Sequence, residues 1–304
     1  MAWSPDSIVK SKLVFFGDGE GYELEDLLRS TAGVLGKGTF GTSYKSELPE
    51  KSAVVVKRLK IGCLPVEEFT ERVHEVGKMM THENLLPLKA YCWHHSEILL
   101  VYDHMSMGSL AFRLHGNEGK NKASLNWEVR TSIAYGVANA IQSLHAQGST
   151  ICHGNIRSSN VFLTNFLEVR VSEFCLARLL SPDSKLDLVP GYRAPEVTSP
   201  HQVSHQSDVY SFGVLLLELL TGKAPLDAFS KNNGVDLPNW VRAMFREKPI
   251  CDVFDSTLAK AEGNAEQLVQ LLQVAICCTF QYPNKRPSMA AVADQIKKTC
   301  SLWF

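Results

Sequence analysis

The chain has 304 residues, of which 45% are hydrophobic and 21% are charged, and its formal net charge is -1. This composition is that of an ordinary soluble globular protein, and it excludes disordered and fibrous classes. The nearly neutral charge gives no electrostatic footprint for nucleic acid, which we do not expect as a partner.

The first part of the chain is predicted to be rich in strands. Residues 1–21 are weakly patterned and glycine-rich, which predicts a flexible leader. Leucines at helical spacing predict a helix over 23–29, and alternating β-branched residues predict hairpin strands over 34–60. A helix over 67–80 and a short apolar strand over 97–102 follow.

The rest of the chain is predicted to be helical. Amphipathic or buried helices are expected over residues 126–145, 208–220, 239–245 and 266–280. The sequence therefore predicts an α+β fold with two lobes. A small β-rich lobe is expected over residues 22–105 and a larger helical lobe over residues 106–304.

Two further features concern the compartment. The eight cysteines show no C-x-x-C pair and no framework spacing, so they are interpreted as scattered small hydrophobic residues in a reducing compartment. The longest apolar run, from Val214 to Leu220, is far shorter than the roughly 20 residues of a membrane-spanning helix. No signal sequence or membrane segment is predicted.

A glycine-rich turn and a strand lysine open a series of ordered motifs. Residues 35–41 read L-G-K-G-T-F-G, and Lys57 ends the strand V-V-V-K. Each is weak evidence alone, because a glycine cluster is more often a bare hairpin and a strand lysine is more often a solvated charge. Five landmarks follow in order: H-G-N-I-R-S-S-N at 153–160, V-S-E-F-C at 171–175, A-P-E at 194–196, D-V-Y-S-F-G at 208–213 and K-R-P at 285–287.

This series resembles the protein-kinase family over residues 22–299, and more narrowly the kinase domain of a plant leucine-rich-repeat receptor-like kinase. The narrower resemblance rests on residues 99–110, on H-G-N and on G-Y-R-A-P-E at 191–196. It implies a fold with the nucleotide site between two lobes. It also implies a longer, membrane-spanning parent receptor, with this domain on the cytoplasmic side of the plasma membrane and itself soluble.

The base position of the catalytic loop has lost its carboxylate. The family pattern H-R-D-x-x-x-x-N appears here with Asn155 in place of the aspartate, and with Asn160 kept. An amide cannot accept the proton of the substrate hydroxyl. General base catalysis contributes about 10²–10⁴-fold, so this change is expected to cost roughly 3–5 kcal/mol of barrier.

The metal position is altered as well. D-F-G reads Glu173-Phe174-Cys175, which keeps a carboxylate on a longer side chain and removes the glycine. Because Mg²⁺ demands near-ideal octahedral geometry, its binding is not expected here. The alternative is that Glu173 and Asn160 hold an ion together.

Gly154 occupies the position whose arginine receives the activation-loop phosphate in most regulated kinases, and glycine has no side chain for this task. Ser181 and Ser184 carry the only serine or threonine hydroxyls between residues 175 and 193. The alternative interpretation is an active kinase that lacks this switch.

The helix partner of Lys57 is ambiguous from the sequence. The family pairs this lysine with a helix glutamate, and the spacing from Phe69 places that position near Arg72. Either Arg72 faces the nucleotide site, and two cations meet, or Arg72 is solvated and Glu71 or Glu75 serves.

The supporting positions are better kept than the catalytic ones. The resemblance implies a buried pair between Glu196 and Arg286, and it implies that Asp208 holds amides of the catalytic loop. For a nucleotide it implies contacts from three glycines of the loop, from Lys57 and from residues near the lobe junction. These residues are Gly36, Gly38, Gly41, Lys57, Tyr102, Asp103 and Met105.

The sequence thus predicts a pseudokinase that binds an active co-receptor or cytoplasmic kinase, with weak ATP binding or none. One alternative is an atypical Ser/Thr kinase in which Glu173 holds metal and Asn155 only orients the hydroxyl. Another is a nucleotide-gated switch, in which ATP favours one arrangement of the lobes.

Overall fold

The computed structural model describes residues 12–17, 21–48, 53–59, 64–79, 82–94, 97–116, 125–181, 190–199, 201–226, 235–247, 249–259 and 263–300. The chain divides into two compact units, each described by itself below. The first comprises residues 1–81, 86–104 and 176–187, and the second comprises residues 82–85, 105–175 and 188–304. Residues 82–85 and 105 were expected in the first lobe, and residues 176–187 in the second, so each lies in the other unit.

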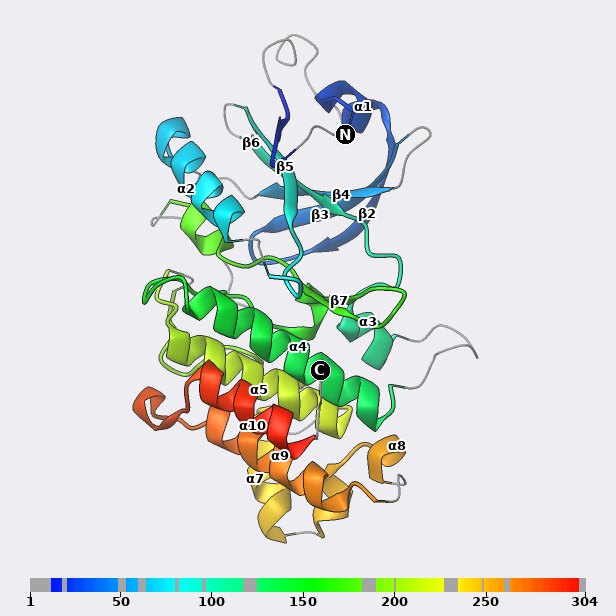
Figure 1. Ribbon diagram of the computed structural model, residues 1–304, viewed down its shortest axis with the longest axis vertical. Coiled ribbons are helices and arrows are strands. Elements are labelled where there is room, and N and C mark those ends of the chain that lie inside the picture. Colours follow the sequence, from blue (N-terminus) through cyan, green and yellow to red (C-terminus); the bar gives the residue numbers. More distant parts are fainter. Residues whose placement is uncertain are drawn as a thin grey trace. The chain divides into compact units, whose positions relative to one another are not determined.

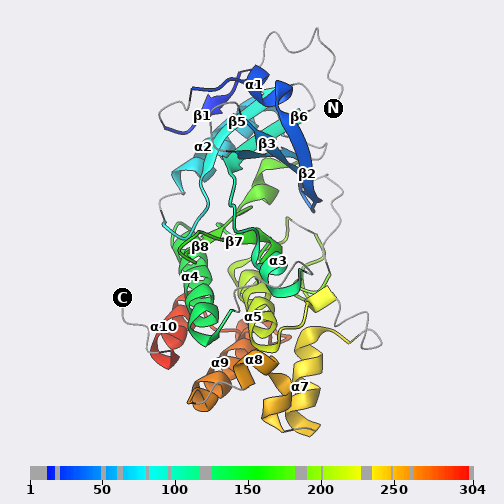
Figure 2. The ribbon, with the colours of Figure 1, turned by 90° about the vertical axis from the view of Figure 1, so that its right-hand side faces the viewer.

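A six-stranded antiparallel sheet forms the frame of the first unit, in the order β1-β5-β6-β4-β3-β2 (Figure 2). Its strands are β1 (Val14–Phe15), β2 (Thr31–Lys37), β3 (Gly41–Glu47), β4 (Val54–Leu59), β5 (Leu88–His94) and β6 (Glu97–Asp103). Two helices, α1 (Leu24–Arg29) and α2 (Val66–Lys78), complete the unit together with the short 3-10 helix η3 (Leu176–Leu179).

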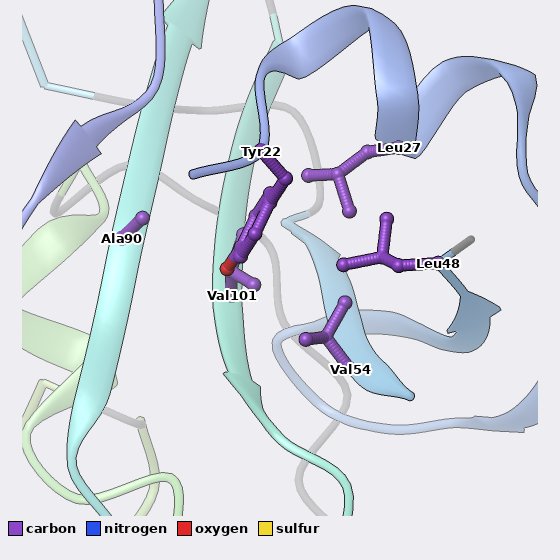
Figure 3. Packing of buried hydrophobic residues seen from close by; sticks show 6 residues of the cluster. All are labelled: Tyr22, Leu27, Leu48, Val54, Ala90 and Val101. Carbon is purple, nitrogen blue, oxygen red and sulfur yellow. The ribbon is translucent and has the colours of Figure 1, made fainter. Parts of the chain in front are cut away.

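The two faces of this sheet carry different residues because side chains alternate along each strand. On one face, Val54, Ala90 and Val101 form a buried cluster with Tyr22 and Leu27, which belong to α1 and the residues before it (Figure 3). On the other face, Tyr91 contacts Phe69 of α2 with ring centroids 5.7 Å apart. The sheet is therefore covered on both sides by apolar side chains of a helix.

Helices dominate the second unit (Figure 1). Its α-helices are α3 (Leu110–His115), α4 (Trp127–His145), α5 (His205–Thr221), α7 (Leu237–Glu247), α8 (Ser256–Ala259), α9 (Ala265–Cys278) and α10 (Met289–Thr299). Strands β7 (Val161–Leu163) and β8 (Val169–Val171) form a small hairpin, and the 3-10 helices are η2 (Ser158–Asn160), η4 (Ile250–Val253) and η5 (Pro283–Lys285). Helix α4 packs on α5 and α10, and α5 packs on α9.

Local sequence explains where the long helices begin and end. Asn126 caps α4 by accepting a hydrogen bond from the Val129 amide at 3.0 Å. Ser204 and Ser207 form a reciprocal capping box at the start of α5, and Gly222 ends that helix with φ +66°. Such caps satisfy amides and carbonyls that a helix end leaves without partners.

The structure confirms the α+β fold, with an antiparallel sheet in the first unit and helices in the second. It also contains elements that the sequence analysis did not predict, including β1 inside the proposed leader, β5, the β7-β8 hairpin, α3 and α10. In the part of the chain that the structure describes, no helix is long and apolar enough to cross a lipid bilayer.

The cysteines are scattered over the described residues and differ in exposure. Among the seven whose surroundings the structure describes, all are free thiols, and Cys251 and Cys277 are exposed. Burial raises the pKa of the Cys92 thiol to about 11. Cys63 lies outside the described residues.

The pair Glu196 and Arg286 joins a buried arginine to a carboxylate whose side chain is 30% exposed. The Arg286 side chain is 0% exposed, and its Nη1 and Nη2 donate to the two carboxylate oxygens at 2.6 and 2.8 Å. Burial opposes ionisation of Glu196, but hydrogen bonds and the charge of Arg286 outweigh it and lower the pKa of the carboxyl. This bidentate geometry is the strong form of the Arg–carboxylate interaction.

Replacing Glu196 with Gln should lower the free energy of unfolding by roughly 3 kcal/mol, because Arg286 would be left as a buried charge without a counterion. The matched control is Asp294→Asn, which breaks an exposed pair with Lys298 and should change stability by less than about 0.5 kcal/mol. Urea denaturation of both variants measures the contrast, and equal effects would contradict the structural role of Glu196.

Candidate functional site

The candidate site residues come from both units, and each set is described within its own unit. In the first unit, the glycine-rich turn joins β2 to β3, with the Gly38 amide donating to the Gly41 carbonyl at 2.8 Å. A Cβ added to Gly41 would lie 2.0 Å from the Arg58 carbonyl oxygen, so this glycine is required by the fold. A Cβ on Gly36 would meet nothing within 4 Å, so the chain's own packing does not explain this glycine.

Lys57 lies on the same face of the sheet as Tyr102. Lys57 is 2% exposed and pairs across the strands with Leu100, and Tyr102, 7% exposed, pairs with the neighbouring Val55. Asp103 instead directs its carboxylate to Lys89, whose Nζ is 3.3 Å away. The sequence-predicted nucleotide residues of this unit are thus only partly gathered on one face.

Two of the α2 residues considered as neighbours of Lys57 form ion pairs. Arg72 binds Glu68 at 2.7 Å along the partly exposed surface of the helix. Glu75 binds Arg178 of η3, with Nη2 and Oε2 3.0 Å apart. Arg72 therefore has its own carboxylate partner on α2, and the carboxylate of Glu75 is engaged by the segment that follows the E-F-C motif.

In the second unit, the structure brings together the degenerate base and metal positions. Asn155 Nδ2 donates a hydrogen bond to Glu173 Oε2 at 2.9 Å. The amide must present its nitrogen to a carboxylate that carries a charge, since its carbonyl oxygen has no proton to offer. Asn160 Nδ2 donates a hydrogen bond to the main-chain carbonyl oxygen of Asn155 at 2.8 Å. This bond closes the loop between two residues that are five positions apart.

Two residues of the E-F-C motif adopt a backbone that usually requires glycine. Glu173 has φ +63° and Cys175 has φ +59°, with Phe174 buried between them. The Cys175 amide donates to the His153 carbonyl at 3.1 Å, and its thiol donates to the Cys152 carbonyl at 3.1 Å. These contacts hold the strained turn against the catalytic loop.

Gly154 also has a left-handed backbone, with φ +74°. A Cβ at this position would lie 3.3 Å from Cγ2 of Val203, closer than most such contacts. The glycine therefore suits its local backbone, independently of any phosphate-receiving role. Of the two serines named between residues 175 and 193, Ser184 lies outside the described residues.

Asp208 fixes the catalytic loop from the first turn of α5. Its carboxylate accepts the amides of His153 at 2.7 Å and Gly154 at 2.9 Å, and His145 Nε2 lies 3.0 Å away. Asp208 is 1% exposed, so these bonds replace its hydration. The loop keeps its shape although its base is missing.

A buried polar network at Glu218 was not predicted from the sequence. Glu218 is 1% exposed and accepts from Ser158 at 2.8 Å, from Tyr192, and lies 2.8 Å from His115 Nε2. Burial, followed by the charge of Glu218, raises the pKa of Tyr192 well above its ordinary value. The signal in the sequence was a lone glutamate inside the apolar run of α5.

The residues fit a magnesium ion in type but not fully in arrangement. Glu173 and the Oδ1 atom of Asn160 are oxygen ligands of the kind Mg²⁺ prefers, and they would hold an ion if one bound. One carboxylate oxygen of Glu173, however, already accepts the Asn155 hydrogen bond. In the second unit, the Met105 carbonyl accepts a hydrogen bond from the Gly108 amide at 3.0 Å.

Comparison with known proteins identifies the class. The profile of the family "Protein tyrosine and serine/threonine kinase" matches residues 30–296. This chain belongs to the protein-kinase family.

Curated relatives and solved structures narrow the resemblance. The chain is 50% identical to the "Probable inactive receptor kinase RLK902" of Arabidopsis thaliana, over 94% of this chain and 45% of the relative. It is 42% identical to a "Probable leucine-rich repeat receptor-like protein kinase" of the same plant, over 95% and 44% of the two chains. The resemblance to plant receptor-like kinases is thereby confirmed, and the chain spans about half the length of these relatives.

Two solved structures share the fold. The pseudokinase domain of BIR2, described as an immune regulator, has a TM-score of 0.81 and 29% identity, covering 96% of this chain and 90% of that one. The maize SIRK1 kinase domain, bound to AMP-PNP, has a TM-score of 0.81 and 31% identity, covering 94% and 99%. One of these structures is of a pseudokinase and the other holds an ATP analogue.

Because the backbone at Cys175 has a positive φ, we expect a glycine variant at this position to be more stable than an alanine variant. Cys175→Gly should be more stable than Cys175→Ala by about 1 kcal/mol, because glycine alone adopts positive φ without strain. At Cys278, buried in α9, the same two substitutions should rank in the opposite order. Urea denaturation of the four variants tests this, and Ala above Gly at both sites would contradict the assigned strain.

Burial of His153 should make the protein less stable in weak acid. Burial lowers the pKa of this imidazole to about 4, although Asp208 and Glu173 oppose the shift. The unfolded chain therefore takes up the proton first as the pH falls below about 6.5, and the stability from this site is lost progressively towards the folded pKa.

Between about pH 7 and about pH 5 the loss should be roughly 2 kcal/mol. His153→Asn, which keeps an acceptor for the Asn155 amide but does not titrate, should remove this part of the pH dependence. Urea denaturation at several pH values in this range measures the free energy of unfolding of both proteins. The same pH dependence in both would contradict a buried, neutral His153.

Proposed function

We propose that this chain is the catalytically impaired kinase domain of a plant receptor-like kinase, which acts by binding active kinases and binds ATP weakly or not at all. The observation that carries the proposal is the hydrogen bond from Asn155 to Glu173. It places an amide donor where phosphoryl transfer requires a carboxylate acceptor, and it engages the carboxylate that would hold metal. Relatives named as inactive receptor kinases support the same conclusion.

The residues that stabilise the catalytic loop and the helical unit are retained, which favours a binding role. Asp208 still holds the catalytic loop, and Glu196 still pairs with Arg286, although the chemistry that these contacts serve in an active kinase is absent. What these contacts preserve is the shape of the helical unit. We infer that a surface of this domain is recognised by an active co-receptor or cytoplasmic kinase, at the cytoplasmic side of the plasma membrane.

An atypical Ser/Thr kinase is the competing function, and one observation favours it. Glu173 retains a carboxylate beside the catalytic loop, and Asn160 retains an oxygen ligand, so a metal could displace the Asn155 amide. In a loose transition state, proton transfer comes late, and Asn155 would then only orient the hydroxyl.

Restoring the base separates the two functions. Asn155→Asp would place two carboxylates at the 2.9 Å contact now made with Glu173, so this variant should be less stable than the parent and should regain stability on addition of Mg²⁺. Thermal unfolding with and without the ion measures this rescue.

The double variant Asn155→Asp with Glu173→Asp should then show phosphate transfer that the parent lacks. The matched control, Asn165→Asp, adds the same charge in the exposed β7-β8 turn and should gain nothing. A parent that already transfers phosphate, with little change in the double variant, would support the atypical kinase instead. Thermal-shift titration with ATP, with and without metal, tests the nucleotide-gated switch; no shift at millimolar ATP removes that function.

A further inference from the structure

A short strand outside the matched kinase region is joined to the sheet of the first unit. The family match begins at residue 30, whereas β1 comprises Val14–Phe15. Val14 pairs with Tyr91 and Phe15 with Ala90, and the Phe16 amide donates to the Lys89 carbonyl at 2.9 Å. Residues 12–17, called the strap below, therefore extend the kinase sheet beyond β5 (Figure 2).

Alternation along the strap gives it two apolar faces. Leu13 and Phe15 pack against the cluster beneath α1, where the Phe15 and Tyr22 rings meet edge to face with centroids 5.3 Å apart. Figure 3 shows Tyr22 in that cluster, beside Val101. The next residue, Phe16, contacts Tyr91 at 5.8 Å on the other side of the sheet, the side that faces α2.

Phe16 is fitted to helix α2. Its ring lies 5.5 Å from that of His74, and a Cβ added to Gly77 would lie only 2.3 Å from the Phe16 Cε1 atom. Glycine is a poor residue for a helix interior, and Gly77 stands one residue before the end of α2. The contact with Phe16 supplies a reason for its presence there.

Helix α2 also contacts η3. Glu75 of α2 binds Arg178 at 3.0 Å, while Leu176 and Leu179 of η3 are buried. One turn of α2 therefore contacts both a segment that precedes the kinase region and the segment that follows the E-F-C motif. Both contacts lie within the first unit.

We propose that the strap is a coupling device: it transmits the state of the chain N-terminal to the kinase region to α2 and, through Glu75 and Arg178, to η3. Seating of Phe16 against Gly77 orders α2 and favours the Glu75–Arg178 pair. Release of the strap frees the helix end and loosens η3. The proposal does not depend on whether the domain transfers phosphate.

Hydrogen exchange of the full chain, followed by mass spectrometry, tests the coupling. Phe16→Ala should speed amide exchange in residues 69–76 and 176–179 by at least about fivefold, with α4 and α5 of the second unit unchanged. The matched control is Val14→Ala, which shortens a side chain on the same strand that is 39% exposed, and it should leave exchange in α2 and η3 as in the parent.

The reciprocal variant is Gly77→Ala. If α2 did not contact Phe16, this change would stabilise the helix, because alanine favours a helix more than glycine does. If Phe16 packs against Gly77, the new methyl group must displace its ring, so amide exchange at residues 15–16 and 89–91 should become faster. If Phe16→Ala also speeds exchange in α4 and α5, Phe16→Leu serves in its place and should give a smaller, local effect on α2. Equal α2 exchange in the Phe16 and Val14 variants, or an unchanged strap in Gly77→Ala, would overturn the proposal.

Discussion

The hydrogen bond between Asn155 and Glu173 is the constraint on which the functional account depends. In this bond the Asn155 side-chain amide is the donor and the Glu173 carboxyl group is the acceptor. In a kinase with two carboxylates at these positions, a cation must lie between them, one of them must be protonated, or the two must move apart. Here Asn155 occupies the position of the base, and its side chain donates a hydrogen bond to Glu173.

The surrounding contacts maintain this arrangement. Asp208 holds the amides before Asn155, while Cys175 returns a hydrogen bond to the loop from a strained backbone. On the side of the catalytic loop these contacts are made by main-chain atoms, so they tolerate the change of the catalytic side chains. The fold of a kinase and its chemistry are therefore separable, since different atoms of the same residues serve each.

Much of this could be predicted from the sequence, and the remainder could not for physical reasons. Capped, strongly patterned helices such as α4 and α5 were found with boundaries close to those observed. The two-residue strand β1 was missed because the evidence for it lies in its pairing with β5, whose partner residues are 75 and 77 positions away in the sequence. The α2 partner of Lys57 was ambiguous because neighbouring positions on a helix look alike in the sequence, and the pairing of Glu75 with Arg178, 103 residues later, was not predicted.

The site was predicted in its residue types but not in its conformation. Asn155, Glu173 and Gly154 could be recognised by their order in the chain, yet neither the bond between the first two nor the left-handed backbone of Glu173 and Cys175 is written in local patterns. The network at Glu218 needed three distant segments to meet at one carboxylate.

The most direct measurement is a single-turnover assay of phosphate transfer from labelled ATP, with purified chain in excess and with Mg²⁺ or Mn²⁺ present, on the protein itself and on a generic substrate. The account predicts no transfer above that of buffer. Transfer at the rate of an ordinary kinase, abolished by Lys57→Met, would contradict it.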